Sequence, residues 1–162
     1  MKKILLILAI IAALALPTRA ESYTNEQIIG MCDTILNTPY DEDSPDRIQI
    51  MVLTGRLIEW GMETKEVTLD IGNCYRAMAK GLNDEQKWAM LGAYLAADIR
   101  YLLVNGLHAS CLESVQAAVR EVLEYYKRAD GRIHATRTLK RLCRLNEEQL
   151  NKYVAKKYKP GR

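Results

Sequence analysis

The sequence has no Phe, and its 162 residues include only two His, four Pro and four Cys. It contains no H-E-x-x-H, which excludes the helical zinc site of the common metalloproteases. No Ser lies in a G-x-S-x-G segment, which excludes the nucleophile turn of α/β-hydrolases. Without a C-x-x-C, a thioredoxin-type redox pair and a zinc ribbon are excluded as well. A glycine-rich phosphate loop is also missing, so the sequence predicts neither a cofactor nor a metal.

An acidic stretch at 41–46, DEDSPD, is the candidate for a calcium loop. An EF-hand loop that starts at Asp41 needs Gly at its sixth position and Glu at its twelfth, where this chain has Asp46 and Val52. The stretch therefore predicts a solvated loop, with Ser44 as helix cap and Pro45 at the first helical position of the next helix. The scarcity of catalytic residues predicts a protein that is not an enzyme. Carboxylates that converge in space into a glycosidase-like pair are the alternative.

The N-terminal segment 1–20, MKKILLILAIIAALALPTRA, has the pattern of a secretory signal peptide. Lys2 and Lys3 precede an apolar run of 13 residues, and small or short side chains at Thr18 and Ala20 precede the predicted cleavage after Ala20. A helix of that length spans about 20 Å, against roughly 30 Å for the hydrocarbon core of a membrane, so a transmembrane anchor is the weaker interpretation. We therefore expect a periplasmic or secreted protein of bacterial type.

The charge of the chain after residue 20 is balanced overall and strongly polarised along its length. Lys2, Lys3 and Arg19 account for the formal net charge of +3. Residues 21–60 then hold eight acids and two bases, whereas residues 131–162 hold two acids and ten bases. Neutral net charge removes the general attraction that nucleic acid needs. The sequence therefore does not favour nucleic acid as a partner.

Helical periodicity recurs throughout residues 21–162, and strand signals are nearly absent. We predict one all-α domain of about seven helices, because the length suits a single core and no linker divides the chain. Capping boxes at Thr24 and Gln27, at Ser110 and Glu113, and at Asn146 and Gln149 mark three of the helix starts. The predicted helices cover about 25–37, 45–61, 65–80, 84–104, 111–130, 132–145 and 147–158.

The four Cys of an exported chain most simply form two disulfides. They are Cys32, Cys74, Cys111 and Cys143. Three connectivities are possible, and we favour Cys32–Cys74 with Cys111–Cys143, because each would join neighbouring helices. The positions lie within or beside apolar stripes, which indicates structural rather than reactive thiols.

The basic C-terminal quarter concentrates its charge on two helix faces with apolar undersides. At 100° per residue, four cations of the helix 132–145 share one arc, and Lys152, Lys156 and Lys159 share a face of the last helix. Tyr125 is the expected exposed aromatic beside them, whereas Tyr126 and Tyr153 are expected to point inwards. The predicted binding residues are Arg137, Lys140, Arg141, Arg144, Lys152, Lys156 and Tyr125.

Like charges at i and i+4 repel, so something is expected to offset them. One alternative is internal, with Asp41, Glu42, Asp43 and Asp46 packed near the basic end. A second is an acidic protein partner, and a third is anionic lipid, cell-wall polymer or, least of all, nucleic acid. The sequence thus predicts a non-catalytic periplasmic binding protein, such as an immunity protein, inhibitor or chaperone. A component of an envelope secretion or conjugation apparatus, or a carboxylate-dependent enzyme acting on cell wall or carbohydrate, is the alternative.

Overall fold

A computed structural model describes residues 23–159, and over that range the chain is all-α. Its helices are α2 (Asn25–Asn37), α3 (Asp46–Glu63), α4 (Asn73–Ala79), α5 (Asp84–Val104), α6 (Leu112–Arg128), α7 (Arg137–Leu142) and α8 (Glu147–Lys157). The predicted signal peptide lies outside the described residues. Between residues 23 and 159, no helix is both long and apolar enough to cross a membrane.

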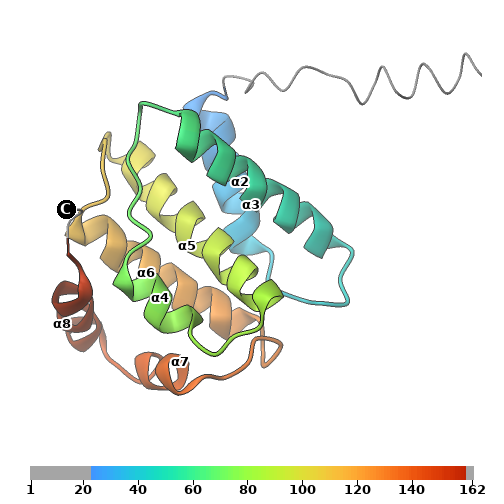
Figure 1. Ribbon diagram of the computed structural model, residues 1–162, viewed down its shortest axis with the longest axis vertical. Coiled ribbons are helices and arrows are strands. Elements are labelled where there is room, and N and C mark those ends of the chain that lie inside the picture. The colour runs from blue at the N-terminus through green and yellow to red at the C-terminus, as the bar shows by residue number, and fades with distance from the viewer. Residues whose placement is uncertain (1–22, 160–162) are drawn as a thin grey trace, which may run out of the picture.

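Helix α5 is the centre of the fold, and α2, α3, α4 and α6 all pack against it (Figure 1). Most of its length is buried, including small residues such as Gly92, Ala93 and Ala96. A Cβ at Gly92 would overlap with the side chain of Thr54 in α3, so glycine is what lets these two helices approach so closely. The helix predicted at 84–104 is therefore confirmed, and burial of most of its length explains its apolar composition.

Local capping signals predicted two of the helix starts correctly, whereas at α3 the cap is Pro45 rather than Ser44, with no capping hydrogen bond from its side chain. Thr24 and Gln27 form a capping box at α2, as Asn146 and Gln149 do at α8. The start of α6 differs from the prediction, because Cys111 is its cap and bonds reciprocally with Ser114. Ser110, the expected cap, instead turns its hydroxyl towards Asp98 of α5.

Two predicted helices are shorter than expected. The helix predicted at 65–80 is helical only as α4 (Asn73–Ala79). Before it, the backbone of Thr68 pairs with His108 and Ser110 through two hydrogen bonds of 2.9 Å, and this pairing holds the segment extended. The helix predicted at 132–145 is helical only as α7 (Arg137–Leu142), because Thr136 caps it by accepting a hydrogen bond from the Leu139 amide.

The two predicted disulfides are absent, and all four cysteines are free. Helix α2, with Cys32, packs on α3, α5 and α6, whereas α4, with Cys74, packs on α5, α6, α7 and α8. Cys111 and Cys143 lie at the start of α6 and the end of α7. Contact between these helices is not sufficient, because a disulfide requires the two Cα atoms to lie within about 7 Å, and no two of the four cysteines are joined. Burial raises the pKa of Cys32 to about 12 and that of Cys74 to about 11.

Candidate functional site

The short helix α7 presents a cationic face because its two leucines are buried. Leu139 and Leu142 point into the core, with 0% and 1% of their surface exposed. The predicted cations of the helix and of the segment after it are all exposed: Arg137, Lys140, Arg141 and Arg144. The helical phase predicted from the sequence is thus confirmed for this segment.

These cations surround a hollow of about 560 Å³ that is open to solvent. Its lining consists of Arg137, Lys140, Arg141, Arg144, Ala135 and Leu145. We call this feature the cationic hollow. Its walls are charged, and two apolar side chains contribute to its surface. Such a combination suits a ligand that carries negative charge and some apolar surface.

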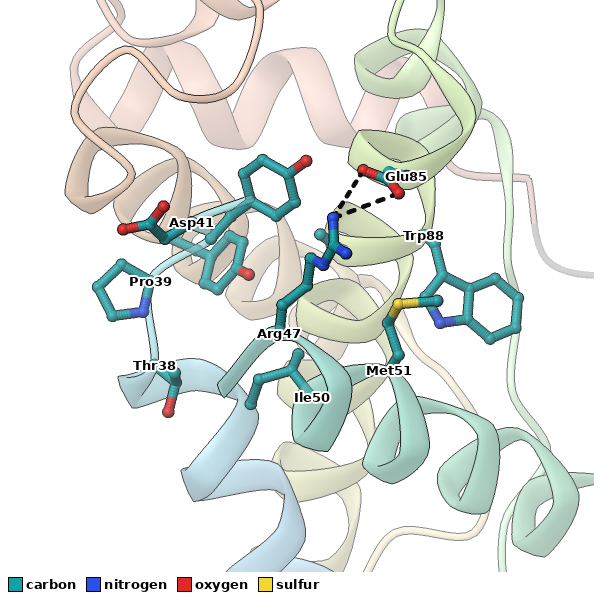
Figure 2. Close-up of a pocket in the computed structure, with 11 residues that line it drawn as sticks. Thr38, Pro39, Asp41, Arg47, Ile50, Met51, Glu85 and Trp88 are labelled. Carbon is teal, nitrogen blue, oxygen red and sulfur yellow. Dashed lines mark hydrogen bonds and ion pairs between the residues drawn. The ribbon is translucent and has the colours of Figure 1, made fainter. Parts of the chain in front are cut away.

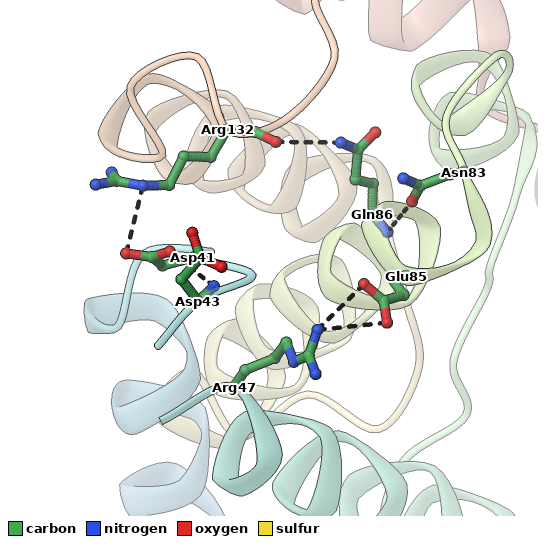
Figure 3. Close-up of polar contacts among 7 residues, drawn as sticks. All are labelled: Asp41, Asp43, Arg47, Asn83, Glu85, Gln86 and Arg132. Carbon is green, nitrogen blue, oxygen red and sulfur yellow. Dashed lines mark hydrogen bonds and ion pairs between the residues drawn. The ribbon is translucent and has the colours of Figure 1, made fainter. Parts of the chain in front are cut away.

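The carboxylates of the described chain do not neutralise the cationic hollow. Over residues 23–159, none of its four cations forms an ion pair. The acidic N-terminal third reaches the basic end at a different point, where Arg132 Nε lies 3.3 Å from Asp41 Oδ2 (Figure 3). The internal alternative therefore accounts for Arg132, whereas the four cations of the hollow have no ion-pair partner between residues 23 and 159.

Arg141 is held in place by an aromatic ring. Its guanidinium lies 5.3 Å from the centre of the Tyr153 ring, in the geometry of a cation–π contact. Tyr153 comes from α8 and is half-buried, and burial raises the pKa of its hydroxyl. The sequence shows Tyr153 near basic residues but not this pairing, because the two residues belong to different helices. The contact restricts Arg141 before any ligand arrives, which lowers the entropy lost on binding.

The predicted cations of α8 differ from those of α7. Lys152 Nζ lies 2.6 Å from Glu148 Oε1, so its charge is already balanced one turn away. Lys156 is exposed and, within the described part of the chain, forms no ion pair. The centre of positive charge is therefore α7, with Lys156 as an outlying contribution.

The expectation that Tyr125 is exposed is wrong. Tyr125 is 1% exposed and lies in the core, where burial raises its pKa, whereas Tyr126 is the half-buried residue. Tyr125 and Tyr126 lie three and four residues after the buried Val122, so helical periodicity allows either of them to be the buried residue. Packing of α6 against α5 selects Tyr125. Tyr125 is therefore a core residue and not an exposed aromatic beside the cations of α7.

A second hollow lies between the α2–α3 loop and the starts of α3 and α5. Figure 2 shows its apolar side chains, including Ile50, Met51 and Trp88, beside the ion pair in which Arg47 Nη1 lies 3.4 Å from Glu85 Oε2. Its volume is about 20 Å³, room for about one water molecule. The two carboxylates in its lining, Asp41 and Glu85, are both ion-paired with arginine. This hollow cannot hold a sugar ring, so it does not support the glycosidase alternative.

The remaining candidates for chemistry have structural partners. His108 Nδ1 lies 3.0 Å from the carbonyl oxygen of Glu66, and the amide of Asp46 donates to the Ser44 hydroxyl oxygen over 3.2 Å. Among residues 23–159, no group of three His, Cys, Asp or Glu side chains is arranged to hold a metal ion.

Comparisons with known proteins leave the site to be interpreted from its own geometry. No protein-family model matches the chain, and neither a curated protein nor a solved structure is significantly similar to it.

Proposed function

We propose that this protein is an exported, non-catalytic helical binding protein that uses the cationic hollow to bind an acidic protein partner. The observation that carries the proposal is that four exposed cations line one hollow and that no carboxylate between residues 23 and 159 pairs with them. Immunity proteins, inhibitors and chaperones of the periplasm are the functional classes that such a surface fits. Export is proposed from the N-terminal segment alone.

A protein partner is favoured over a purely ionic ligand by the composition of the hollow. Ala135 and Leu145 contribute apolar surface between the charges, and Arg141 is prepositioned on Tyr153. Arginine and aromatic side chains are the residue types that most often dominate protein interfaces. Binding of an anionic lipid or polymer would require only the positive charges and not the apolar surface of the hollow.

Charge reversal tests this proposal directly. Arg141→Glu with Arg144→Glu is expected to leave the fold intact, because both side chains are exposed, and to weaken capture of the partner by about tenfold or more, on the order of 1.4 kcal/mol. The matched control is Arg76→Glu with Lys80→Glu, which makes the same change in net charge at exposed positions on and beside α4.

The assay is affinity capture from the envelope fraction of the native cell, at low and at high salt, followed by a binding titration with the protein identified. The proposal is wrong if the reversed protein and the control capture the same partner equally well. Binding to anionic vesicles or to cell-wall polymer in place of a protein would support the alternative ligands.

The export part of the proposal has its own measurement. Protein isolated from its native cell is expected to begin at Glu21, and N-terminal sequencing or intact mass determines this. A chain that retains Met1 would remove the argument for the envelope without affecting the cationic hollow.

A further inference from the structure

The outer face of α3 is apolar and uncovered. Ile48, Met51 and Val52 are 66%, 44% and 49% exposed, and their spacing of three and four residues places them on one face of the helix. Gly55 follows on the same face, with open space where a Cβ would be. Trp88 of α5, 36% exposed, lies beside Met51 in Figure 2. Contiguous apolar surface of this kind marks an interaction site more often than an accident of sequence.

Acidic side chains frame this apolar face. Between residues 41 and 63 the chain has six acids and two bases. Glu59 and Glu63 lie within about 60° of Ile48 around the helix axis, so they continue its face towards the end of α3. Both are exposed, and neither forms an ion pair with any residue from 23 to 159. We call the set Ile48, Met51, Val52, Glu59 and Glu63 the acidic ridge.

The acidic ridge and the cationic hollow are complementary. The ridge is a convex helix face with apolar side chains and carboxylates, whereas the hollow is concave, with Ala135 and Leu145 among its cations. The ridge carries two carboxylates and the hollow four cations, and none of these groups forms an ion pair within residues 23–159. Shape, charge and apolar content therefore match in the same pair of surfaces.

One copy of the chain cannot join its own two surfaces. In Figure 1, α3 lies along one edge of the molecule, and α7 and α8 lie along the opposite edge. Helix α3 packs on α2 and α5, and α7 packs on α4. We infer that the cationic hollow receives the acidic ridge of a second copy of this chain, in a head-to-tail contact. The inference rests on the proposed function, because both use the cationic hollow as a docking surface.

Such a contact joins two different surfaces, so each copy keeps one of them free. Head-to-tail contacts of this kind close into rings or continue as open chains. The second copy also occupies the hollow that the acidic partner needs. Self-association therefore hides the binding face when the protein is concentrated, and a tighter partner displaces the second copy.

Two charge reversals and their mixture test the contact. The first is Arg141→Glu with Arg144→Glu, and the second is Glu59→Lys with Glu63→Lys. The first variant leaves the hollow with two bases and two acids, so its net charge is zero, and the second variant makes the ridge basic like the hollow. Each variant alone therefore lacks one of the two complementary surfaces and is expected to stay monomeric. In an equal mixture the intact cationic hollow of the second variant meets the intact acidic ridge of the first, so the mixture is expected to associate again. Circular dichroism and thermal unfolding check that both variants fold, and Glu59→Gln with Glu63→Gln is the milder version of the second.

Analytical ultracentrifugation of the purified proteins measures the association. For the unmodified protein, apparent mass is expected to rise by about twofold or more with concentration at low ionic strength, as head-to-tail pairs form. The rise should shrink in about 1 M salt, where the Debye length falls to about 3 Å. A protein that stays monomeric at every concentration and salt would overturn the inference, as would association that the ridge variant leaves unchanged. Failure of the mixture to associate would also overturn it.

The same variants test the proposed function independently of self-association. The ridge variant keeps the cationic hollow, so it is expected to capture the acidic partner at least as well as the unmodified protein does. Capture that persists in a protein with no self-association would keep the proposed function and remove this inference. If the hollow variant loses partner capture and the ridge variant keeps it, the proposed function is supported, whether or not ultracentrifugation detects self-association.

Discussion

The carboxyl group of Asp98 and the hydroxyl of Ser110 lie 2.5 Å apart in the interior, where Asp98 has no exposed surface. The same hydroxyl oxygen accepts a hydrogen bond of 2.9 Å from the Asp70 amide. Ser110 thereby links α5 to the extended segment before α4. Among residues 23–159, Asp98 Oδ1 has no hydrogen-bond partner. Burial raises the pKa of this carboxyl group, although its hydrogen bond with Ser110 opposes the effect.

Replacing Asp98 with Asn is expected to flatten the pH dependence of stability. Because burial raises the folded-state pKa above the unfolded value of about 3.9, the folded protein binds more protons between the two pKa values. The free energy of unfolding therefore falls as pH rises through that window, and Asn removes this term. Urea unfolding between about pH 4 and pH 8 measures it.

Asp43→Asn is the control for this substitution, because Asp43 is exposed in the α2–α3 loop. It should preserve the pH profile of the unmodified protein. If the free energy of unfolding changes with pH equally in the Asp98 variant and in the unmodified protein, the buried carboxyl group has the same pKa in the folded and the unfolded protein.

Gly92→Ala is expected to destabilise the protein by about 1–3 kcal/mol, the usual cost of overpacking a core. The new methyl group would overlap with Thr54, whose hydroxyl is buried, so α3 and α5 would have to separate. Gly30→Ala in α2 is the matched control, since open space surrounds its Cβ position. It should stabilise the helix by up to about 1 kcal/mol. Chemical denaturation should show that the free energy of unfolding falls in the Gly92 variant and rises in the Gly30 variant. Changes of the same sign in both variants would contradict the close contact between α3 and α5.

Tyr153→Leu is expected to weaken partner binding severalfold, because it removes the ring beneath Arg141, a contact worth about 0.5–1 kcal/mol at an exposed site. Tyr153→Phe keeps the ring and should keep most of the affinity. Titration of both variants with the captured partner is the measurement. A Phe variant as weak as the Leu variant would assign the effect to the hydroxyl group instead.

Four free thiols are expected in the purified protein, and their reactivity should follow burial. Cys111 and Cys143 are partly exposed and should react first with a thiol reagent. Cys32 and Cys74 should react slowly near neutral pH, because their raised pKa values leave little thiolate. Thiol titration in denaturant without reductant counts them all. A count of zero would mean that the disulfides predicted from the sequence form after all.

The cationic hollow shows how far sequence reasoning extends and where it stops. Helical periodicity placed Arg137, Lys140, Arg141 and Arg144 on one face, because Leu139 and Leu142 mark the buried side. The same method failed for Tyr125, since i+3 and i+4 positions both fit the stripe of α6. It also overextended the helix before α4, where backbone pairing between Thr68 and the α5–α6 loop competes with helical hydrogen bonds.

By itself, the sequence determined the all-α class, most of the helix starts and the face on which the α7 cations lie. These depend on residues within about one turn of each other, through capping hydrogen bonds and the 3.6-residue period. Only the tertiary structure decided that the cysteines stay apart, that Tyr125 is buried, and that Arg132 rather than α7 meets the acidic loop. Each of these outcomes depends on how helices that are distant in the sequence pack around α5, and helical periodicity within one segment does not encode that packing.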